Sequence, residues 1–187
     1  ILTSNWQGDD WRATAYGQLY DWHMLSNATY AEDGQINQFD RRNTFGGRYE
    51  HIFETNDQLK FLVGSEVRYD VIAKVGLDST NAGEFVANIS NNHIDETSVG
   101  VYGEATWKPV EPLRLTAGLR ADAYDFDVDV NKNAGTATGS GEERDSLASP
   151  KLGVAYVLSN QWEAYANWGR GFHSNDARGV VNKAAAV

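Results

Sequence analysis

The sequence has 187 residues, which suits one domain, and no cysteine, which excludes a disulfide scaffold and cysteine-based zinc sites. The net charge is -10 and no dense run of Lys and Arg is present, so nucleic acid is not expected as a partner. No apolar run approaches the roughly 20 residues of a membrane-spanning helix, and the mean hydropathy is -0.52. Periodicity must therefore decide the fold class.

Strand periodicity recurs along the chain, with side chains alternating between two faces. Residues 11–25 are rich in Trp and Tyr, and residues 42–53 alternate less regularly. Clear alternation of apolar and polar side chains follows in residues 59–71, 99–107, 113–123, 150–158 and 162–169. We therefore predict seven strands, with residues 1–6 as the end of an eighth.

The connections between these strands alternate in length. Tight polar turns are expected at 7–10, 54–57, 108–112 and 159–161, and long connections at 26–35, 74–93, 131–149 and from 174 onward. Outer-membrane barrels have this arrangement, with short periplasmic turns and long outer loops. Only every second side chain of a barrel strand meets lipid, so its mean hydropathy is unremarkable. The pattern predicts an all-β, antiparallel up-and-down transmembrane β-barrel of the bacterial outer membrane.

Large aromatic residues gather beside the short turns, as expected for a girdle at one membrane interface in contact with outer-membrane lipid. The girdle residues are Trp6, Trp11, Phe53, Trp107 and Trp162. The alternative is an antiparallel β-sandwich with these side chains in its core. A sandwich explains neither the position of the tryptophans nor the unequal connections, which favours the barrel.

Seven is an odd number, whereas single-chain bacterial barrels have an even number of strands. A strand edge exposed to lipid is also untenable, because its backbone groups find no partner there. We therefore expect residues 1–187 to be an internal part of one barrel domain, contributing about seven to eight strands of a larger barrel.

Several segments resemble the barrel of TonB-dependent outer-membrane receptors. The resemblance is carried by NWGRGFHSNDARG at 167–179, SPKLGVAY at 149–156, QFDRR at 38–42 with FGG at 45–47, and YGEA at 102–105 leading to LRAD at 119–122. These segments are spread over nearly the whole chain, and their combination is more specific than any one of them.

The resemblance implies a barrel of about 22 strands plugged by an N-terminal globular domain. Such receptors import scarce nutrients with energy relayed by TonB, which makes a ferric siderophore the leading substrate, with cobalamin or carbohydrate as others. The plug and the TonB-contacting segment have no counterpart here, so this stretch alone is not expected to transport. A passive porin and a barrel-type surface adhesin remain alternatives.

Binding residues are expected on long outer loops and on the lumen wall near them. One candidate group for contact with a small-molecule substrate, such as an iron chelate, or with the plug is Asp40, Arg41 and Arg42, at an outer strand end. The other, just past the last strand, is His173, Asn175, Asp176 and Arg178. An ion network or loop-ordering hydrogen bonds are the alternative roles.

Further charged residues are expected to line the lumen and solvate it. They are Lys60, Glu66, Arg68, Glu104, Arg114, Arg120 and Glu163. The alternating Asp run from Asp125 to Asp129 matches a calcium loop poorly, because it lacks the glycine at the sixth position and the glutamate at the twelfth. The four histidines share no metal-ligand spacing. No metal site, cofactor or enzymatic activity is therefore predicted.

Overall fold

The computed structural model describes residues 1–26, 34–133, 139–171 and 177, which form one antiparallel sheet with the strands in chain order. The eight strands are β1 (Leu2–Gln7), β2 (Trp11–Ser26), β3 (Gln35–Asn56), β4 (Leu59–Asn81), β5 (Glu84–Val110), β6 (Leu113–Asn133), β7 (Gly141–Ser159) and β8 (Trp162–Gly169). The up-and-down meander expected from the sequence is confirmed, and the sandwich is excluded because the described strands form a single sheet.

Residues at the start of the chain form the eighth strand that the sequence only suggested. β1 pairs with β2 from Leu2 opposite Gly17 to Gln7 opposite Arg12. The odd count of seven is thereby corrected to eight in the described part of the chain. β1 and β8 are the two edges of the sheet and are not paired with each other.

The four short turns are confirmed, but two of the expected long connections are mostly strand. The segment 74–93 forms the ends of β4 and β5, which meet at a two-residue turn, Ala82 and Gly83. The segment 131–149 is also largely strand, since β6 runs to Asn133 and β7 starts at Gly141. Above a membrane both faces of a strand meet water, so the apolar alternation that identifies strands is lost there.

The β4–β5 turn has the backbone of a tight hairpin. Ala82 and Gly83 have φ values of 50° and 84°. Positive φ at both central residues is the type I′ geometry that matches the twist of the flanking strands. Alanine is an unfavourable residue at its position, because its Cβ crowds the backbone in the left-handed region.

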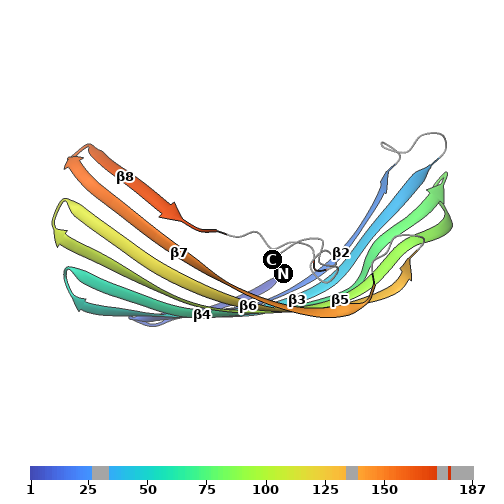
Figure 1. Ribbon diagram of the computed structural model, residues 1–187, viewed down its shortest axis with the longest axis horizontal. Coiled ribbons are helices and arrows are strands. Elements are labelled where there is room, and N and C mark those ends of the chain that lie inside the picture. Colours follow the sequence, from blue (N-terminus) through green and yellow to red (C-terminus); the bar gives the residue numbers. More distant parts are fainter. Residues whose placement is uncertain (27–33, 134–138, 172–176, 178–187) are drawn as a thin grey trace.

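Figure 1 shows the eight strands as one strongly curved sheet. Its concave face carries the few fully buried apolar side chains, Phe126 and Val128, which pack with Ile94. The short turns of β3–β4, β5–β6 and β7–β8 lie at one rim, at the left of Figure 1. Among the described residues, no helix has the length and hydropathy needed to cross a bilayer.

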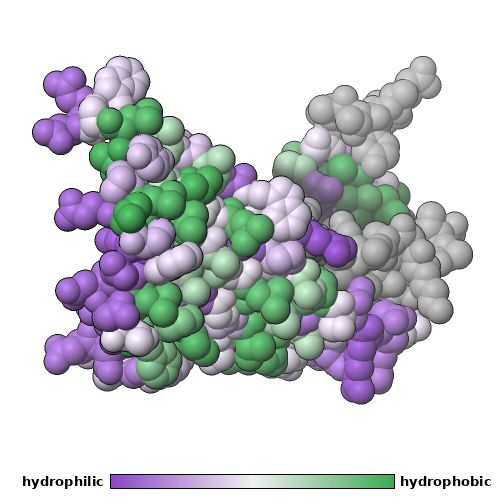
Figure 2. All heavy atoms as spheres, turned by 60° about the vertical axis from the view of Figure 1, so that its left-hand side comes forward, coloured by the Kyte–Doolittle hydropathy of each residue, from purple (hydrophilic) through white to green (hydrophobic). Residues whose placement is uncertain are grey.

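The outer face of the sheet is apolar and exposed. It includes Phe45, Val63, Val101, Leu119 and Leu152, each about half exposed or more. Figure 2 shows apolar residues gathered across the face in view, with hydrophilic residues along its left margin. A contiguous apolar surface of this kind indicates contact with lipid and not with water.

This apolar band ends sharply on the side away from the short turns. On β4 it runs from Leu59 to Tyr69, about the 9–11 residues that a barrel strand needs to cross a bilayer. Immediately beyond it, Asp95 and Asp125 stand on the outer face of β5 and β6, and the Tyr69 hydroxyl donates a hydrogen bond to Asp95 at 3.1 Å. The strands therefore continue well past the membrane.

Candidate functional site

The concave face carries a continuous network of charged side chains from five strands. We call it the lumen network, and its members are Arg12 of β2, Arg48 and Glu50 of β3, Glu66 of β4, Tyr102 of β5, and Arg120 and Asp122 of β6. Period-two alternation places all of them on the same side of the sheet, since the register pairs Arg48 with Glu66 and Tyr102 with Arg120.

Glu66 lies at the centre of this network. Its carboxylate accepts from the Arg120 guanidinium at 3.1 Å and lies 3.5 Å from that of Arg48. Arg120 in turn donates from Nε to both oxygens of Asp122, at 2.8 and 2.9 Å. One arginine therefore joins carboxylates of β4 and β6, on either side of β5, which restricts its rotamers.

Tyr102 links the two halves of the lumen network. Its hydroxyl donates to Glu50 at 2.7 Å, and its ring lies under the Arg120 guanidinium, 5.4 Å from ring centroid to Cζ. The ring lies across Gly64 of β4, where a Cβ would come within 2.4 Å of it. Glu50 also pairs with Arg12. The glycine thus provides the space in which the aromatic bridge lies flat.

A repeated two-residue spacing builds the rest of the wall. Arg68 donates to Asp70 at 2.6 and 3.1 Å, Arg120 pairs with Asp122, and Arg42 donates to Asp40 at 2.9 Å. Residues two apart on a strand share a face, so each arginine reaches the carboxylate beside it. Asp40 and Arg42 lie near the outer end of β3, where the hydrogen bond to Asp40 raises the pKa of Arg42 above its ordinary value.

Burial is unequal within these pairs, because the carboxylates lie against the sheet and the guanidinium groups point away from it, into the lumen. The side chains of Asp70, Glu50 and Asp122 are 3%, 6% and 1% exposed, whereas their partners Arg68, Arg12 and Arg120 are 50%, 57% and 32% exposed. The concave wall consequently presents guanidinium groups, each held in place by a buried acid.

A hollow of about 360 Å³ lies on this wall between the charged network and an apolar cluster nearer the outer rim. Arg42, Arg68 and Arg120 border it on the charged side. Ile72, Ile94 and Tyr124 border it on the other, and Tyr124 stacks on Phe126 with ring centroids 5.8 Å apart. Ala177, which is 4% exposed, packs against this cluster. Glu66 and Glu96 also line the hollow, which therefore combines arginine and glutamate side chains with apolar and aromatic surface.

The predicted site residues are only partly brought together. Asp40 and Arg42 lie on the concave face as one ion pair, but Arg41 points to the other face, where it lies 3.8 Å from Asp21. His173, Asn175, Asp176 and Arg178 lie outside the described residues. The five girdle residues stand beside the short turns on the outer face, 37% to 71% exposed.

The expected lumen charges occupy the concave face in ion pairs. Lys151 pairs with Glu104, Arg114 lies 3.0 Å from Glu163, and Lys60 lies 3.1 Å from Glu54. The sequence reasoning did not single out Asp70 and Asp122, the buried acids that hold the arginines. The Arg-x-Asp spacing at 68–70 and 120–122 is the signal that would have identified them.

Outside the membrane band, the Asp run of β6 engages a cation of the next strand. Arg144 pairs with Asp125, and this hydrogen bond raises the pKa of the exposed Arg144 guanidinium. No group of three or more His, Asp or Glu side chains in the part of the chain that the structure describes is arranged to hold a metal ion.

A curved meander with an apolar outer face, aromatic residues at its turn rim and an ion-paired concave face is the wall of a transmembrane β-barrel. Residues 2–182 match the family model "TonB dependent receptor-like, beta-barrel". The chain belongs to this family of transporters and receptors, whose barrels lie in the outer membrane of Gram-negative bacteria.

Solved structures of similar fold come from the same kind of protein. The copper transporter OprC matches with a TM-score of 0.66 and 19% identity over 87% of this chain and 27% of its own. The ferric yersiniabactin uptake receptor FyuA from Yersinia pestis gives 0.63 and 14% over 88% and 26%. The ferric citrate transporter FecA gives 0.65 and 16% over 89% and 26%.

At these identities the likeness concerns the fold. The chain spans about a quarter of the length of these structures. No curated protein sequence matches it significantly.

Proposed function

We propose that residues 1–187 form part of the barrel of an active outer-membrane receptor that imports a scarce metal chelate, with a ferric siderophore as the leading substrate. In this proposal a plug domain and further strands complete the receptor, and TonB supplies the energy. The chain's own part is to form lumen wall and lipid-facing surface, with no catalytic role.

The guanidinium groups that the concave wall presents to the lumen are the observation that carries this proposal. A metal chelate with carboxylate, phenolate or hydroxamate oxygens offers acceptors to such groups. Arg42, Arg68 and Arg120 border one hollow, whose other side is formed by Ile72, Ile94 and Tyr124. An anion with an organic framework would find both kinds of contact there. The names of the similar structures also support metal-chelate cargo, since two refer to ferric complexes and one to copper.

The direct test is uptake by cells that express the full-length gene. Radiolabelled iron would be supplied as citrate, catecholate and hydroxamate complexes, and copper as its free ion, to otherwise identical strains with and without TonB. We expect uptake of one ferric complex that disappears without TonB. Uptake that persists without TonB would instead establish a passive porin, and cell attachment with no uptake would establish an adhesin.

A variant of the wall tests the role of its cations. Arg68→Gln removes an exposed guanidinium that donates to Asp70, whereas Arg68→Lys keeps the charge. We expect the glutamine variant to raise KM for uptake about ten-fold, the loss of one hydrogen bond to a charged group, at unchanged maximal rate. Lys60→Gln, at a short periplasmic turn, is the matched control and should leave KM unaltered. An equal effect of both variants would contradict the proposal.

The proposed domain organisation has an independent check. The upstream coding sequence should encode a globular plug preceded by a TonB-contacting segment. A coding sequence with only barrel strands would contradict it.

A further inference from the structure

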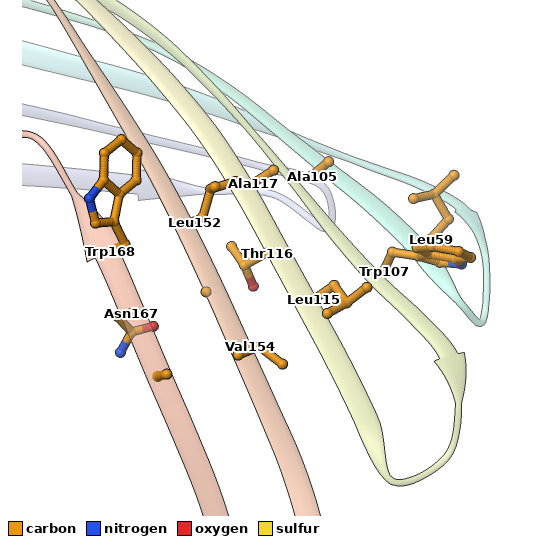
Figure 3. A pocket seen from close by; sticks show the side chains of 12 residues that line it. Leu59, Ala105, Trp107, Leu115, Thr116, Ala117, Leu152, Val154, Asn167 and Trp168 are labelled. Atoms are coloured by element: carbon orange, nitrogen blue, oxygen red, sulfur yellow. The ribbon is translucent and has the colours of Figure 1, made fainter.

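A hollow with a polar rim lies on the outer face of the sheet, beyond the apolar band. We call it the polar hollow; it is formed by β2 to β5 and has a volume of about 320 Å³. This volume is at the lower end of the range of about 300–1,000 Å³ that small-molecule sites occupy. Figure 3 shows the contrasting case within the band, a hollow bordered by side chains such as Trp107, Leu115 and Leu152.

The polar hollow lies too far along the strands to face the lipid tails. Phe45 and Tyr69 are register partners at the end of the apolar band on β3 and β4. Phe39, which lines the hollow, stands six residues further on the same face of β3, about 20 Å along the strand. On a strand tilted by about 45° this is still about 14 Å of height, whereas the headgroup layer is only about 5–7 Å thick.

An aromatic ring forms the floor of the polar hollow. Phe39 is the register partner of Gly76 on β4, and a Cβ on this glycine would come within 2.8 Å of the ring. The phenylalanine is half-buried. The glycine therefore lets the ring lie along the sheet, where it offers a flat apolar surface to a ligand.

Charged side chains stand around this floor. Asp21 lies 3.8 Å from Arg41 and 3.2 Å from His23. Arg41 is the register partner of Asp21 on one side and of Lys74 on the other, so the two cations stand next to each other. Lys74 is exposed and has no ion-pair partner among the described residues. The rim thus offers hydrogen-bond donors beside an acceptor carboxylate.

Two asparagines of β5 complete the lining and have unused acceptors. The Asn88 side-chain amide donates to Asp78 at 2.6 Å. The Oδ1 atoms of Asn88 and Asn91 are buried and accept no hydrogen bond from the part of the chain that the structure describes. Buried acceptors without a donor are costly, and rotation about the broad χ2 torsion of asparagine would turn either oxygen toward the hollow. A ligand with hydroxyl groups supplies such donors.

The charges of the polar hollow balance, which argues against an ionic ligand. Arg41 and Lys74 are matched by Asp21 and Asp78. Asp40 also borders the hollow, but its carboxylate pairs with Arg42 on the concave face. A phosphate or a charged chelate would therefore find no net opposite charge. A neutral sugar fits better, because its hydroxyls both donate and accept and its C–H face packs on an aromatic ring.

We infer that the polar hollow binds one neutral sugar unit, stacked on Phe39 and hydrogen-bonded by Arg41 and Asp21. This site is on the opposite face from the lumen network and does not depend on the proposed cargo. A glycolipid headgroup of the outer leaflet and a free glycan present the same recognition chemistry, and the experiment distinguishes these two sources.

Saturation-transfer difference NMR of the purified full-length receptor tests the site. The probes are the methyl glycosides of glucose, galactose, mannose and N-acetylglucosamine. Phe39→Ala removes the aromatic floor, and Phe45→Ala is the matched control, because it makes the same change on the same face of the same strand within the apolar band. Arg41→Gln alters the rim at a side chain that is 68% exposed, so it leaves packing unaltered.

We expect at least one glycoside to bind wild type and Phe45→Ala equally. Phe39→Ala should weaken binding roughly ten-fold through loss of stacking, and Arg41→Gln about three-fold through loss of one hydrogen bond. Equal binding by Phe39→Ala and Phe45→Ala would overturn the inference. Displacement of the glycoside by inorganic phosphate would also overturn it, because the hollow would then be an anion site.

Native mass spectrometry of the receptor extracted from its own outer membrane identifies the source of the sugar. A bound glycolipid that is present in wild type and Phe45→Ala but lost in Phe39→Ala would assign the sugar to the membrane. Glycoside binding without any bound glycolipid would assign it to a free glycan. Absence of both glycoside and glycolipid from wild type would refute the site.

Discussion

The two faces of this sheet follow opposite rules on the same strands. On the outer face, large apolar side chains such as Leu119 and Val101 are half exposed and have no partners beyond their neighbours in the sheet. On the concave face, polar residues such as Glu50 and Asp122 are buried, with only 5% and 3% of the whole residue exposed, and their side chains are paired. The comparison shows that burial alone does not identify the core of such a protein. The solvent on each side decides which residues each face carries.

The largest expected effect comes from placing a charge on the wrong face. Leu119→Arg, in the middle of the apolar band of β6, should destabilise the full-length receptor in lipid vesicles by about 2–4 kcal/mol. The free energy of unfolding in urea measures it. Gln18→Arg, on the concave face of β2, is the control and should cost far less. Equal losses would show that the two faces meet the same solvent.

A smaller effect is expected from adding a side-chain atom where the concave face is tightly packed. Gly64→Ala places a Cβ within 2.4 Å of the Tyr102 ring, which must then leave both Arg120 and Glu50. We expect a loss of about 1–3 kcal/mol, the usual cost of overpacking. In the double variant Gly64→Ala/Tyr102→Ala the clash is absent. If the alanine costs as much there as in wild type, the crowding account is wrong.

Removing a buried acid of the lumen network should have a similar or smaller effect. Asp122→Ala leaves Arg120 with Glu66 as its remaining acid, and because the guanidinium is 32% exposed, water replaces part of the lost interaction. We expect a loss of about 1–2 kcal/mol, and less for Asp122→Asn, which keeps an acceptor oxygen. Urea unfolding of both variants provides the measurement. A neutral Asp122→Ala would mean that the acid does not stabilise the wall.

The smallest effect concerns the β4–β5 turn, which lies outside the membrane at the end of the strands away from the short turns. Ala82→Gly removes the strain of an alanine at φ 50° and should stabilise the hairpin by about 0.5–1 kcal/mol. Amide hydrogen exchange of Asn81 and Glu84 should slow accordingly. Ala87→Gly, within β5, is the matched control and should accelerate local exchange. Faster exchange in Ala82→Gly would contradict the turn geometry.

The part of the fold inside the membrane could be predicted from the sequence, and the part outside it could not. Residues 59–71 and 113–123 alternate cleanly because one side of each strand meets lipid, and both are strands as expected. Residues 74–93 carry polar side chains on both faces, so their strands had no periodic signal. Bulges in the same stretch, such as that between Ile72 and Val75, shift the register further.

For the candidate site, the sequence predicted which face of the sheet each residue lies on but not which residues it interacts with. Alternation placed Glu66, Arg68 and Arg120 on the lumen side correctly. The prediction grouped Arg41 with Arg42 in one site, but their side chains lie on opposite faces of the sheet. Alternation could have shown this, because adjacent residues of a strand point to opposite faces. The bridge from Tyr102 to Glu50 spans three strands and depends on register, which a single sequence does not specify.

The length of β4 and β5 has a mechanical consequence. Beyond Tyr69 about ten more residues of β4 stay paired with β5, and β3 stays paired with β4 as far as Thr80, so a stiff arm of the sheet extends roughly 35 Å along its strands. Its tip at Ala82 and Gly83 is far from the apolar band, so a change there leaves the lipid-facing residues unaltered. A peptide epitope inserted between these two residues would be held away from the cell surface on a rigid stalk, accessible to antibodies on intact cells.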